Sequence, residues 1–402
     1  MPNTSDKKSL LTILSVAFFI ILITTLITFF ASGYQLNFQK GPVIKATGLL
    51  SATSKPKSAS VYINDQLVTA TDDTINLPPG SYTIKIVKDG YLPWQKTVQI
   101  KPEVVYLTDA FLYRSVTEIK PITLSGAINP AVSPDGNKIV YAVANASAAK
   151  DNGLYLLETY QSPLPLSRSI PPKLLSASAP SLDWSVFTFE FSPNSKSLIA
   201  TNPQIKISYL LPLDSPITAK NMFDISSQIA AIKKDWLSQE AEIITTNLAR
   251  LPMALQSVVA TSSAKQLQIS SGETKILYLA NTTTRLPAIV TTPLISFSNQ
   301  PQTRQIEKGN YYTYDLQTDS NYLVGNSQSV ANLTWLPDSN NLIFVEDNQI
   351  RIIETDSTNK QTLYGGSFNP QIVVPWFDGN KIVTLASAYA GSPENLYSIS
   401  IR

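Results

Sequence analysis

The sequence contains no cysteine and no histidine among its 402 residues. Without cysteine, the chain has no disulfide, no thiolate nucleophile, no thiolate metal ligand and no lipid-modified cysteine. Without histidine, it lacks the usual general base, the Ser-His-Asp triad and the commonest zinc ligand. No catalytic, cofactor-binding or metal-binding residue is therefore predicted. An enzyme of this sequence would have to act through carboxylates, Lys, Tyr or Ser.

Charged residues are also few. They make up 15% of the chain against 43% hydrophobic residues, and 31 basic and 29 acidic residues leave a net charge of +2. This balance permits a large buried core and excludes general disorder, and the length suits two or three domains. Because the chain has no dense Lys/Arg run, nucleic acid is not expected as a partner.

One long uncharged segment lies near the N-terminus. Residues 10–31, from Leu10 through Ile20 to Phe30 and Ala31, are nearly all Leu, Ile, Val, Phe, Ala and Thr. As a helix, the stretch from Leu10 to Phe30 spans about 31 Å, the thickness of a bilayer core. Lys7 and Lys8 precede it, so residues 1–9 are predicted to be cytoplasmic and the rest extracytoplasmic. The chain is thus expected in the cell membrane as a single-pass protein with a signal-anchor.

A cleaved signal peptide is the alternative for the same segment. Ala31-Ser32-Gly33 has the small residues of a cleavage site, but signal peptides usually have a shorter apolar region, of about 7–15 residues. Both interpretations export the remainder of the chain, and the sequence leaves cleavage open. Residues 32–44 are predicted to be a linker.

Residues 45–114 have the alternation of short β-strands separated by turns. Asn64-Asp65 and Asp89-Gly90 are typical hairpin turns. The predicted fold is a small antiparallel β-sandwich. Its expected strands cover residues 60–63, 74–77, 82–87, 97–100 and 104–107.

This segment resembles the PEGA domain family. The resemblance rests on Leu77-Pro78-Pro79-Gly80-Ser81-Tyr82-Thr83-Ile84 followed by Lys88-Asp89-Gly90-Tyr91, a strand, a Pro-x-Gly-type turn, a strand and a Gly-Tyr turn. It implies a cell-envelope protein without a catalytic role in this domain. In purely structural terms, Gly80 and Gly90 are expected to adopt positive φ in turns, and Tyr82 and Tyr91 to pack into the core.

A motif recurs through residues 115–402: a large apolar residue, a turn of Pro, Asp, Gly or Ser, and then a buried strand. Its copies begin at Val132, Phe191, Ile269, Trp335 and Trp376. Such a turn reverses the chain into a hairpin whose apolar flanks are buried between sheets. The motif residues that we single out are Pro134, Asp135, Gly136, Pro193, Trp335, Pro337, Asp338 and Trp376.

Repeated turn-and-strand motifs of this kind predict a β-propeller of five or six blades. The motif Ser133-Pro134-Asp135-Gly136, followed by a strand, resembles the repeats of TolB-like and WD-like propellers. The fold class predicted for the whole chain is therefore mainly β, with an N-terminal transmembrane helix, a PEGA-like sandwich and a propeller.

Residues 225–256 interrupt the repeat and leave two interpretations open. Ile225, Ile229, Ile232 and Trp236 have helical spacing, which favours a helical insertion. The run from Trp236 to Ile244 also fits the blade motif and would make a degenerate blade. The blade count depends on which applies.

Candidate chemistry is sparse. The aspartates of the repeat are expected to form turns by bonding to the local backbone. Trp184, Trp335 and Trp376 either fill the spaces between blades or form a carbohydrate-stacking surface. We expect a non-catalytic, membrane-tethered protein whose propeller binds or scaffolds cell-envelope components, protein or polysaccharide. A glycan-active enzyme using paired carboxylates is the alternative.

Overall fold

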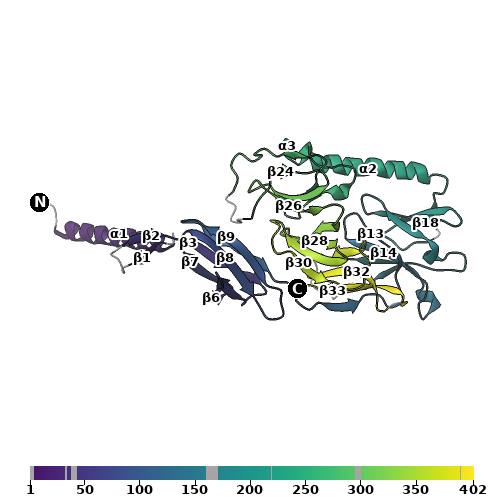
Figure 1. Cartoon of the computed structure of the whole chain (residues 1–402), viewed down its shortest axis with the longest axis horizontal. Coiled ribbons are helices and arrows are strands. Elements are labelled where there is room, and N and C mark those ends of the chain that lie inside the picture. The colour runs from purple at the N-terminus through teal and green to yellow at the C-terminus, as the bar shows by residue number, and fades with distance from the viewer. Residues whose placement is uncertain are drawn as a thin grey trace. The chain divides into compact units, whose positions relative to one another are not determined.

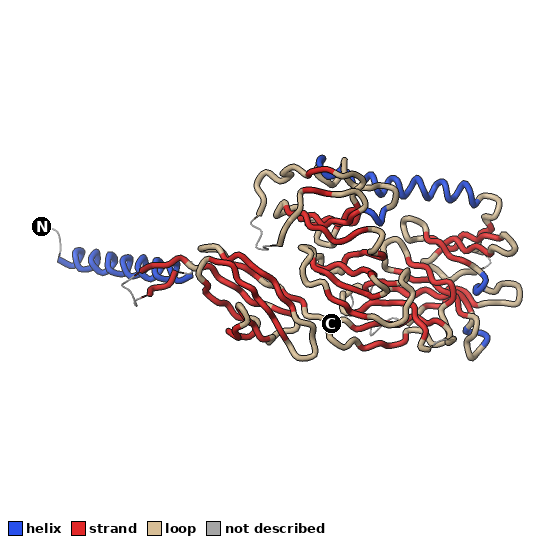
Figure 2. Tube along the Cα trace, in the orientation of Figure 1, coloured by secondary structure: helices blue, strands red, loops and turns tan. Residues whose placement is uncertain are grey.

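The computed structural model describes residues 4–31, 34–37, 43–159, 171–218, 220–294, 300–389 and 391–402. The chain forms two compact units, unit 1 being Met1–Leu112 and unit 2 Tyr113–Ile295 with Gln300–Arg402. Figures 1 and 2 show that β-strands dominate the described residues and that helices are few. The mainly β class predicted from the sequence is confirmed.

Helix α1 (Thr4–Ala31) opens unit 1. All of its side chains between residues 13 and 28 are exposed. The hydroxyls of Thr24, Thr25 and Thr28 donate to the carbonyls four residues earlier, at 2.7, 2.8 and 2.8 Å. Within the residues described, no helix is both long enough and apolar enough to cross a membrane. The anchor expected over residues 10–31 stays a prediction.

The rest of unit 1 is a small β domain. Sheets β6-β5-β8-β9 and β10-β3-β7 enclose its core, and the short pair β11-β4 belongs to the same domain. A separate pair, β1-β2, precedes the domain in the chain. The strands are β1 (Tyr34–Asn37), β2 (Val43–Ala46), β3 (Gly48–Ala52), β4 (Ser54–Lys55), β5 (Ser60–Ile63), β6 (Gln66–Ala70), β7 (Asp73–Leu77), β8 (Gly80–Val87), β9 (Trp94–Ile100), β10 (Val105–Leu107) and β11 (Ala110–Phe111).

The prediction of a purely antiparallel domain is wrong in one respect. Strand β10 pairs with β3 in parallel, and β11 pairs with β4 in parallel. Parallel neighbours need a long connection that returns the chain to its starting end, and the hairpins between β4 and β10 provide it. The two sheets enclose one core, in which Val61, Ile84 and Trp94 are buried.

Unit 2 contains, among the residues described, five four-stranded antiparallel sheets in a β-propeller-like arrangement. We call them blades 1 to 5 and their strands A to D from first to last. Blade 1 is β13 (Ile128–Val132), β14 (Lys138–Val143), β15 (Gly153–Glu158) and β16 (Lys173–Ala177). Blade 2 is β17 (Thr188–Phe191), β18 (Ser197–Asn202), β19 (Ile207–Pro212) and β20 (Phe223–Asp224). Blade 3 is β21 (Leu267–Ile269), β22 (Lys275–Leu279), β25 (Asn310–Asp315) and β26 (Ser320–Asn326).

Blade 4 is β27 (Ala331–Trp335), β28 (Asn341–Glu346), β29 (Gln349–Glu354) and β30 (Gln361–Tyr364). Blade 5 joins the two ends of unit 2. Its first three strands are β31 (Val373–Pro375), β32 (Lys381–Ser387) and β33 (Glu394–Ser400), and its outermost strand is β12 (Glu118–Pro121). Strand β12 pairs antiparallel with β33, from Glu118 opposite Ser400 to Pro121 opposite Tyr397. The last blade is thus completed by the first strand of the unit.

The A–B turns explain why the repeat has its sequence. In every blade the fourth residue of the turn has a positive φ: Gly136 (71°), Ser195 (57°), Glu273 (54°), Ser339 (59°) and Gly379 (67°). Its amide donates to the carbonyl three residues earlier, as Gly136 does to Ser133 at 2.9 Å. Glycine adopts this conformation without steric cost, and the other three residues occupy it within the same turn.

Apolar side chains fill the spaces between neighbouring blades. Trp184 lies in the cluster shared by blades 1 and 2, Trp335 in that of blades 3 and 4, and Trp376 in that of blades 5 and 1. All three are buried. Of the two interpretations of these tryptophans, the structure therefore supports the first, in which they fill the spaces between blades.

The segment between blades 2 and 3 is helical. It holds α2 (Ile229–Ala249) and α3 (Met253–Gln256). Trp236 of α2 packs on Ile199 of blade 2 and on Ile225, and the backbone amide of Ala264, which precedes blade 3, donates to Glu240 of α2 at 3.1 Å. Helix α2 therefore lies between the two blades (Figure 1). The degenerate-blade interpretation is wrong, because the long helix buries its apolar side chains on the blades instead of pairing as a strand.

Three short 3-10 helices, η1 (Ala149–Asp151), η2 (Trp184–Val186) and η3 (Ala264–Gln266), lie in the connections. Strand order fixes where each connection lies. In an antiparallel blade, the A–B and C–D turns meet at one end, and the B–C loops and D–A connections at the other. We call the latter the B–C/D–A end. The α2 segment and the longest B–C loop, residues 280–309, both leave the blades at this end.

Candidate functional site

The largest addition to a single blade is the B–C loop of blade 3. It contains the pair β23 (Thr284–Arg285) and β24 (Gln305–Ile306). It leaves β22 at the B–C/D–A end and folds back over β26, where the amide of Thr303 donates to the carbonyl of Asn321 at 2.8 Å. At the C–D turn, the amide of Leu294 donates to the carbonyl of Gln317 at 2.6 Å. The loop therefore covers the outer edge of blade 3, which an open sheet would leave unpaired.

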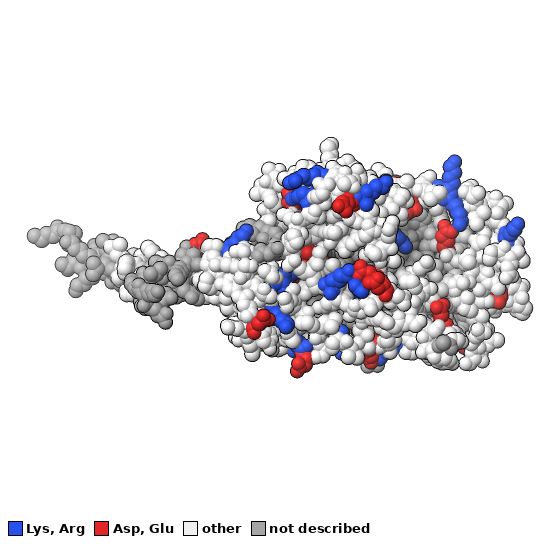
Figure 3. All heavy atoms as spheres, viewed as in Figure 1, with Lys and Arg blue, Asp and Glu red and all other residues white. Residues whose placement is uncertain are grey.

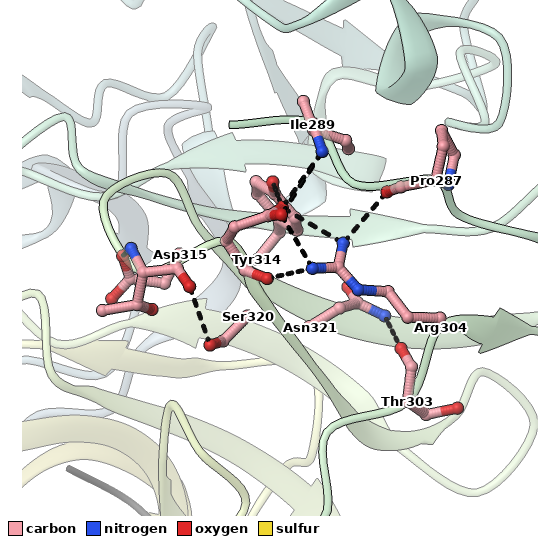
Figure 4. Close-up of polar contacts among 10 residues, drawn as sticks. Pro287, Ile289, Thr303, Arg304, Tyr314, Asp315, Ser320 and Asn321 are labelled. Atoms are coloured by element: carbon pink, nitrogen blue, oxygen red, sulfur yellow. Dashed lines mark hydrogen bonds and ion pairs between the residues drawn. The ribbon is translucent and has the colours of Figure 1, made fainter. Parts of the chain in front are cut away.

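An ion pair holds this loop in place (Figure 4). Arg304 Nη2 lies 2.9 Å from Asp319 Oδ2, and Arg304 Nη1 donates to Asp319 Oδ1 at 3.1 Å. Nη1 also donates to the carbonyl of Pro287 at 3.1 Å. The guanidinium thus joins both arms of the loop to the C–D turn of blade 3. Asp319 has a φ of 51°, a conformation that aspartate tolerates better than most residues.

Two tyrosines complete the cluster around this pair. The hydroxyl of Tyr314 donates to Asp319 Oδ1, and the amide of Ile289 lies 3.3 Å from Oδ2. The hydroxyl of Tyr278 donates to Asn321 Oδ1 at 3.0 Å, and Asn321 Nδ2 donates to the carbonyl of Thr303 at 2.9 Å. The polar atoms of the cluster satisfy one another, as buried polar groups must.

The electrostatics of the cluster oppose acid–base catalysis. Burial alone would raise the pKa of Asp319, but the hydrogen bonds from Arg304 and Tyr314 and the Arg304 charge hold it below its usual value. Burial and the bond to Asp319 raise the pKa of Tyr314 far above its usual range. Both pKa values are thus moved away from neutral pH, near which a general acid or base works best. The contacts of the cluster hold the loop in place.

A second ion pair lies where the two ends of unit 2 meet. Arg402 donates to Asp338 Oδ2 in the A–B turn of blade 4 and, at 3.1 Å, to the hydroxyl of Tyr113. Arg114 Nε donates to the carbonyl of Arg402 at 3.0 Å. The side chains of Arg402 and Asp338 are 14% and 8% exposed. The pair thus links the first and last residues of the unit to blade 4.

Exposed apolar side chains are unevenly distributed between the two ends of the blades. Of those in the described part of unit 2, Leu124, Ile205 and Tyr389 lie on loops at the B–C/D–A end, and Leu237 and Met253 lie on the helical D–A connection. Val116 and Leu294 lie at the other end, and the remaining four lie on outer strands: Ile119, Leu174, Phe223 and Leu323. Loops held on a rigid scaffold are the usual place for binding residues. The B–C/D–A end is therefore the candidate binding face.

The predicted turn residues of unit 1 lie in one hairpin and its neighbours. Pro78 and Pro79 precede β8, and Gly80 is its first residue. Gly90 has a φ of 80° as expected, whereas Gly80 is extended, since it already belongs to the strand. Tyr82 and Tyr91 pack against the core as partly buried side chains, and the Tyr82 hydroxyl donates to the carbonyl of Pro78 at 3.0 Å.

The predicted repeat residues all lie in A–B turns or next to them, and they do not converge on one site. Asp135 and Asp338 accept backbone hydrogen bonds from the residues two positions later, at 3.1 and 2.9 Å. The remaining members have structural positions, Pro134, Gly136, Pro193 and Pro337 in turns, and Trp335 and Trp376 at blade interfaces. Leu10, Ile20 and Phe30 of the predicted anchor belong to α1.

Sequence reasoning missed a pair of asparagines in the A strands. Asn129 and Asn332 each lie five residues before the turn proline, in a bulge, with φ values of 48° and 51°. Asn129 Nδ2 donates to the carbonyl of Phe187 at 2.8 Å, and Asn332 Nδ2 to that of Pro370 at 2.8 Å. Each therefore ties its blade to the next D–A connection. The spacing Asn-x-x-x-x-Pro was the available signal.

No metal site is found in the part of the chain that the structure describes. No group of three or more Asp or Glu is placed to hold a metal ion within the described ranges. On the face drawn in Figure 3, basic and acidic side chains lie interspersed.

Comparison with protein families identifies the small domain. Residues 47–114 match the model of the PEGA domain, so the resemblance noted in the sequence is confirmed for this segment. No curated protein matches the chain.

Among solved structures, the chain is similar to several proteins at low identity. An oligogalacturonate lyase from Vibrio parahaemolyticus is 10% identical, with 71% of this chain and 94% of that chain covered and a TM-score of 0.31. TolB from Acinetobacter baumannii is 14% identical, with coverages of 79% and 59% and a TM-score of 0.18. An auxiliary nutrient binding protein from Bacteroides thetaiotaomicron is 9% identical, with coverages of 86% and 90% and a TM-score of 0.21.

Proposed function

We propose that this chain is a non-catalytic, membrane-tethered, extracytoplasmic protein that binds or scaffolds cell-envelope components through the B–C/D–A end of its propeller. The observation that carries the proposal is the concentration of exposed apolar side chains and of the α2 segment at that end.

The tether is the second part of the proposal. The exposed side chains of α1 between residues 13 and 28 are mostly large and apolar, a surface that lipid would cover. Its threonine hydroxyls donate to carbonyls of their own helix, which suits a segment in hydrocarbon, where unpaired donors are costly. Together with Lys7 and Lys8 on the N-terminal side, these features support an anchor with the propeller outside.

Binding predicts retention on the cell envelope. Full-length protein, purified in detergent, is expected to sediment with envelope isolated from the producing cells, in at least about tenfold excess over an unrelated detergent-solubilised single-pass protein. Prior removal of the envelope proteins by protease distinguishes a protein partner from a polysaccharide. Sedimentation no greater than that of the unrelated protein would contradict the proposal.

The alternative, an enzyme acting on glycans, makes a separate prediction. Hydrolysis of a glycosidic bond uses two carboxyl groups about 5–10 Å apart on either side of the bond. Incubation of the purified chain with envelope polysaccharide would then release shorter fragments over time, measurable by mass spectrometry. A binding protein leaves the polysaccharide length unchanged.

A further inference from the structure

Two loops at the B–C/D–A end are joined by a network of hydrogen bonds. One is the D–A connection of residues 122–127, and the other is the B–C loop of blade 5, residues 388–393 apart from residue 390, taken together with Glu394 and Asn395, the first residues of β33. Asn395 Oδ1 accepts from the amide of Gly126 at 2.9 Å and from the hydroxyl of Thr123 at 3.0 Å. The amide of Ala127 donates to the carbonyl of Glu394 at 2.8 Å. The two loops therefore act as one ordered surface.

Tyr389 projects from this surface on a fixed backbone. Its amide donates to Ser392 Oγ at 3.1 Å, and Ser392 Oγ donates back to the Tyr389 carbonyl at 2.8 Å. The residue is nonetheless 72% exposed, and Leu124 on the joined loop is 84% exposed. An aromatic ring is thus presented to solvent by a backbone that hydrogen bonds hold in place.

The two loops that carry this surface are polar and almost free of charge. Residues 122–127 carry no charged side chain, and Glu394 carries the only charge in residues 387–395. Glu394 is exposed, and serine hydroxyls lie on both loops, at Ser125 and Ser392. Loops that offer one aromatic face, hydroxyls and a single carboxylate match a sugar ring, which has an apolar C–H face and hydroxyl edges.

We propose that the loops around Tyr389 bind a neutral sugar unit of an envelope polysaccharide, a refinement that rests on the binding function proposed above. The Tyr389 ring stacks on the C–H face of the sugar, and the Glu394 carboxylate accepts hydrogen bonds from its hydroxyls. An acidic sugar is disfavoured, because the two loops offer Glu394 and no cation to face it.

The same features argue against a protein partner at this place. Protein interfaces have a dry core of several apolar side chains within a patch of hundreds of Å². The two loops present Tyr389 and Leu124 as their large exposed apolar side chains, and serine and glycine follow each of them in the sequence. Such a surface suits one sugar unit at a time.

Binding of the full-length protein to immobilised neutral oligosaccharides, chains of glucose, mannose, galactose and N-acetylglucosamine, tests the proposal, with polygalacturonate as the acidic comparison. We expect at least one neutral chain to bind and polygalacturonate to bind at least about tenfold more weakly. Tyr389→Ala should weaken neutral binding by about tenfold or more, whereas Tyr389→Phe keeps the ring and should stay within about threefold. Glu394→Gln should weaken it by several-fold, and Phe223→Ala, an exposed aromatic on blade 2, should leave it unchanged.

Two results separate this inference from the broader one. In the first, the wild type and Tyr389→Ala are retained equally on untreated envelope, and neither is retained after the envelope proteins are removed by protease. The partner is then a protein and the sugar site is wrong. Equal binding of Tyr389→Ala and wild type to the neutral chains would also overturn it. Loss of all envelope retention contradicts the proposed function itself.

Discussion

Replacing Arg304 with alanine is expected to lower the free energy of unfolding of unit 2 by about 3 kcal/mol, the cost of breaking a buried ion pair from one side. Asp319 is 5% exposed, so its carboxylate would stay buried without its cation, and the Pro287 carbonyl would lose a donor. Denaturant unfolding followed by tryptophan fluorescence measures the change, because four of the five tryptophans belong to unit 2. The matched control is Arg285→Ala, an exposed arginine in the same loop, which should change the free energy by less than about 0.5 kcal/mol.

The loss at Arg304 should also depend on pH. Because the pKa of Asp319 is lowered in the folded state, the wild type holds this contribution above the unfolded aspartate pKa of about 3.9 and loses it as the pH falls through the folded value. Without Arg304, burial dominates and Asp319 takes up a proton more readily. The deficit of Arg304→Ala should therefore be larger at pH 7 than at pH 4. An equal deficit at both pH values would contradict the pairing.

Replacing Arg402 with alanine is expected to cost about 3 kcal/mol as well, because Asp338 and the Tyr113 hydroxyl are buried around it. Burial raises the pKa of Tyr113 far above its usual range, so this hydroxyl stays neutral and only Asp338 balances the guanidinium in this contact. Arg402→Lys keeps the charge but not the planar fork that reaches both groups, and should cost about half as much.

Proteolysis distinguishes ring closure from simple loss of stability in the Arg402 variant. Since Arg402 lies beside the residues that lead into β12, its loss should make the segment before Glu118 the first site of cleavage. Lys120→Ala, in an exposed pair with Glu118, is the control and should unfold like the wild type. If Arg402→Ala also unfolds like the wild type, the pair does not hold the ends together.

The elements set by local chemistry were predictable from the sequence. The A–B turns recur because Pro, Asp and Gly satisfy a short loop on their own, so Asp135 and Asp338 were recognisable as turn formers. The strands flanking them show period-2 patterns, and the helical spacing of Ile229, Ile232 and Trp236 marks the first turns of α2. In these places the residues that decide the structure are neighbours in the chain.

Contacts between distant residues were not predictable in this way. The pairing of β12 with β33 joins residues about 280 positions apart, and the sequence of neither strand indicates its partner. The parallel pairing of β3 with β10 depends on the path of the whole domain. The same holds for the candidate sites. The sequence indicates only that Asp338 forms a turn, because its contact with Arg402 joins distant parts of the chain. In the same way, the surface around Tyr389 forms only when two distant loops meet.

Cysteine labelling tests the tethered arrangement directly, because the chain has no native cysteine and only an introduced cysteine would react. Single cysteines at Met253, which is 86% exposed in α3, and at Ser5, ahead of the apolar segment, are treated with a membrane-impermeant maleimide on intact cells. We expect Met253→Cys to be labelled at once and Ser5→Cys to be labelled only after the membrane is permeabilised. Labelling of Ser5→Cys on intact cells, with Met253→Cys protected, would contradict an extracytoplasmic propeller held by an N-terminal anchor.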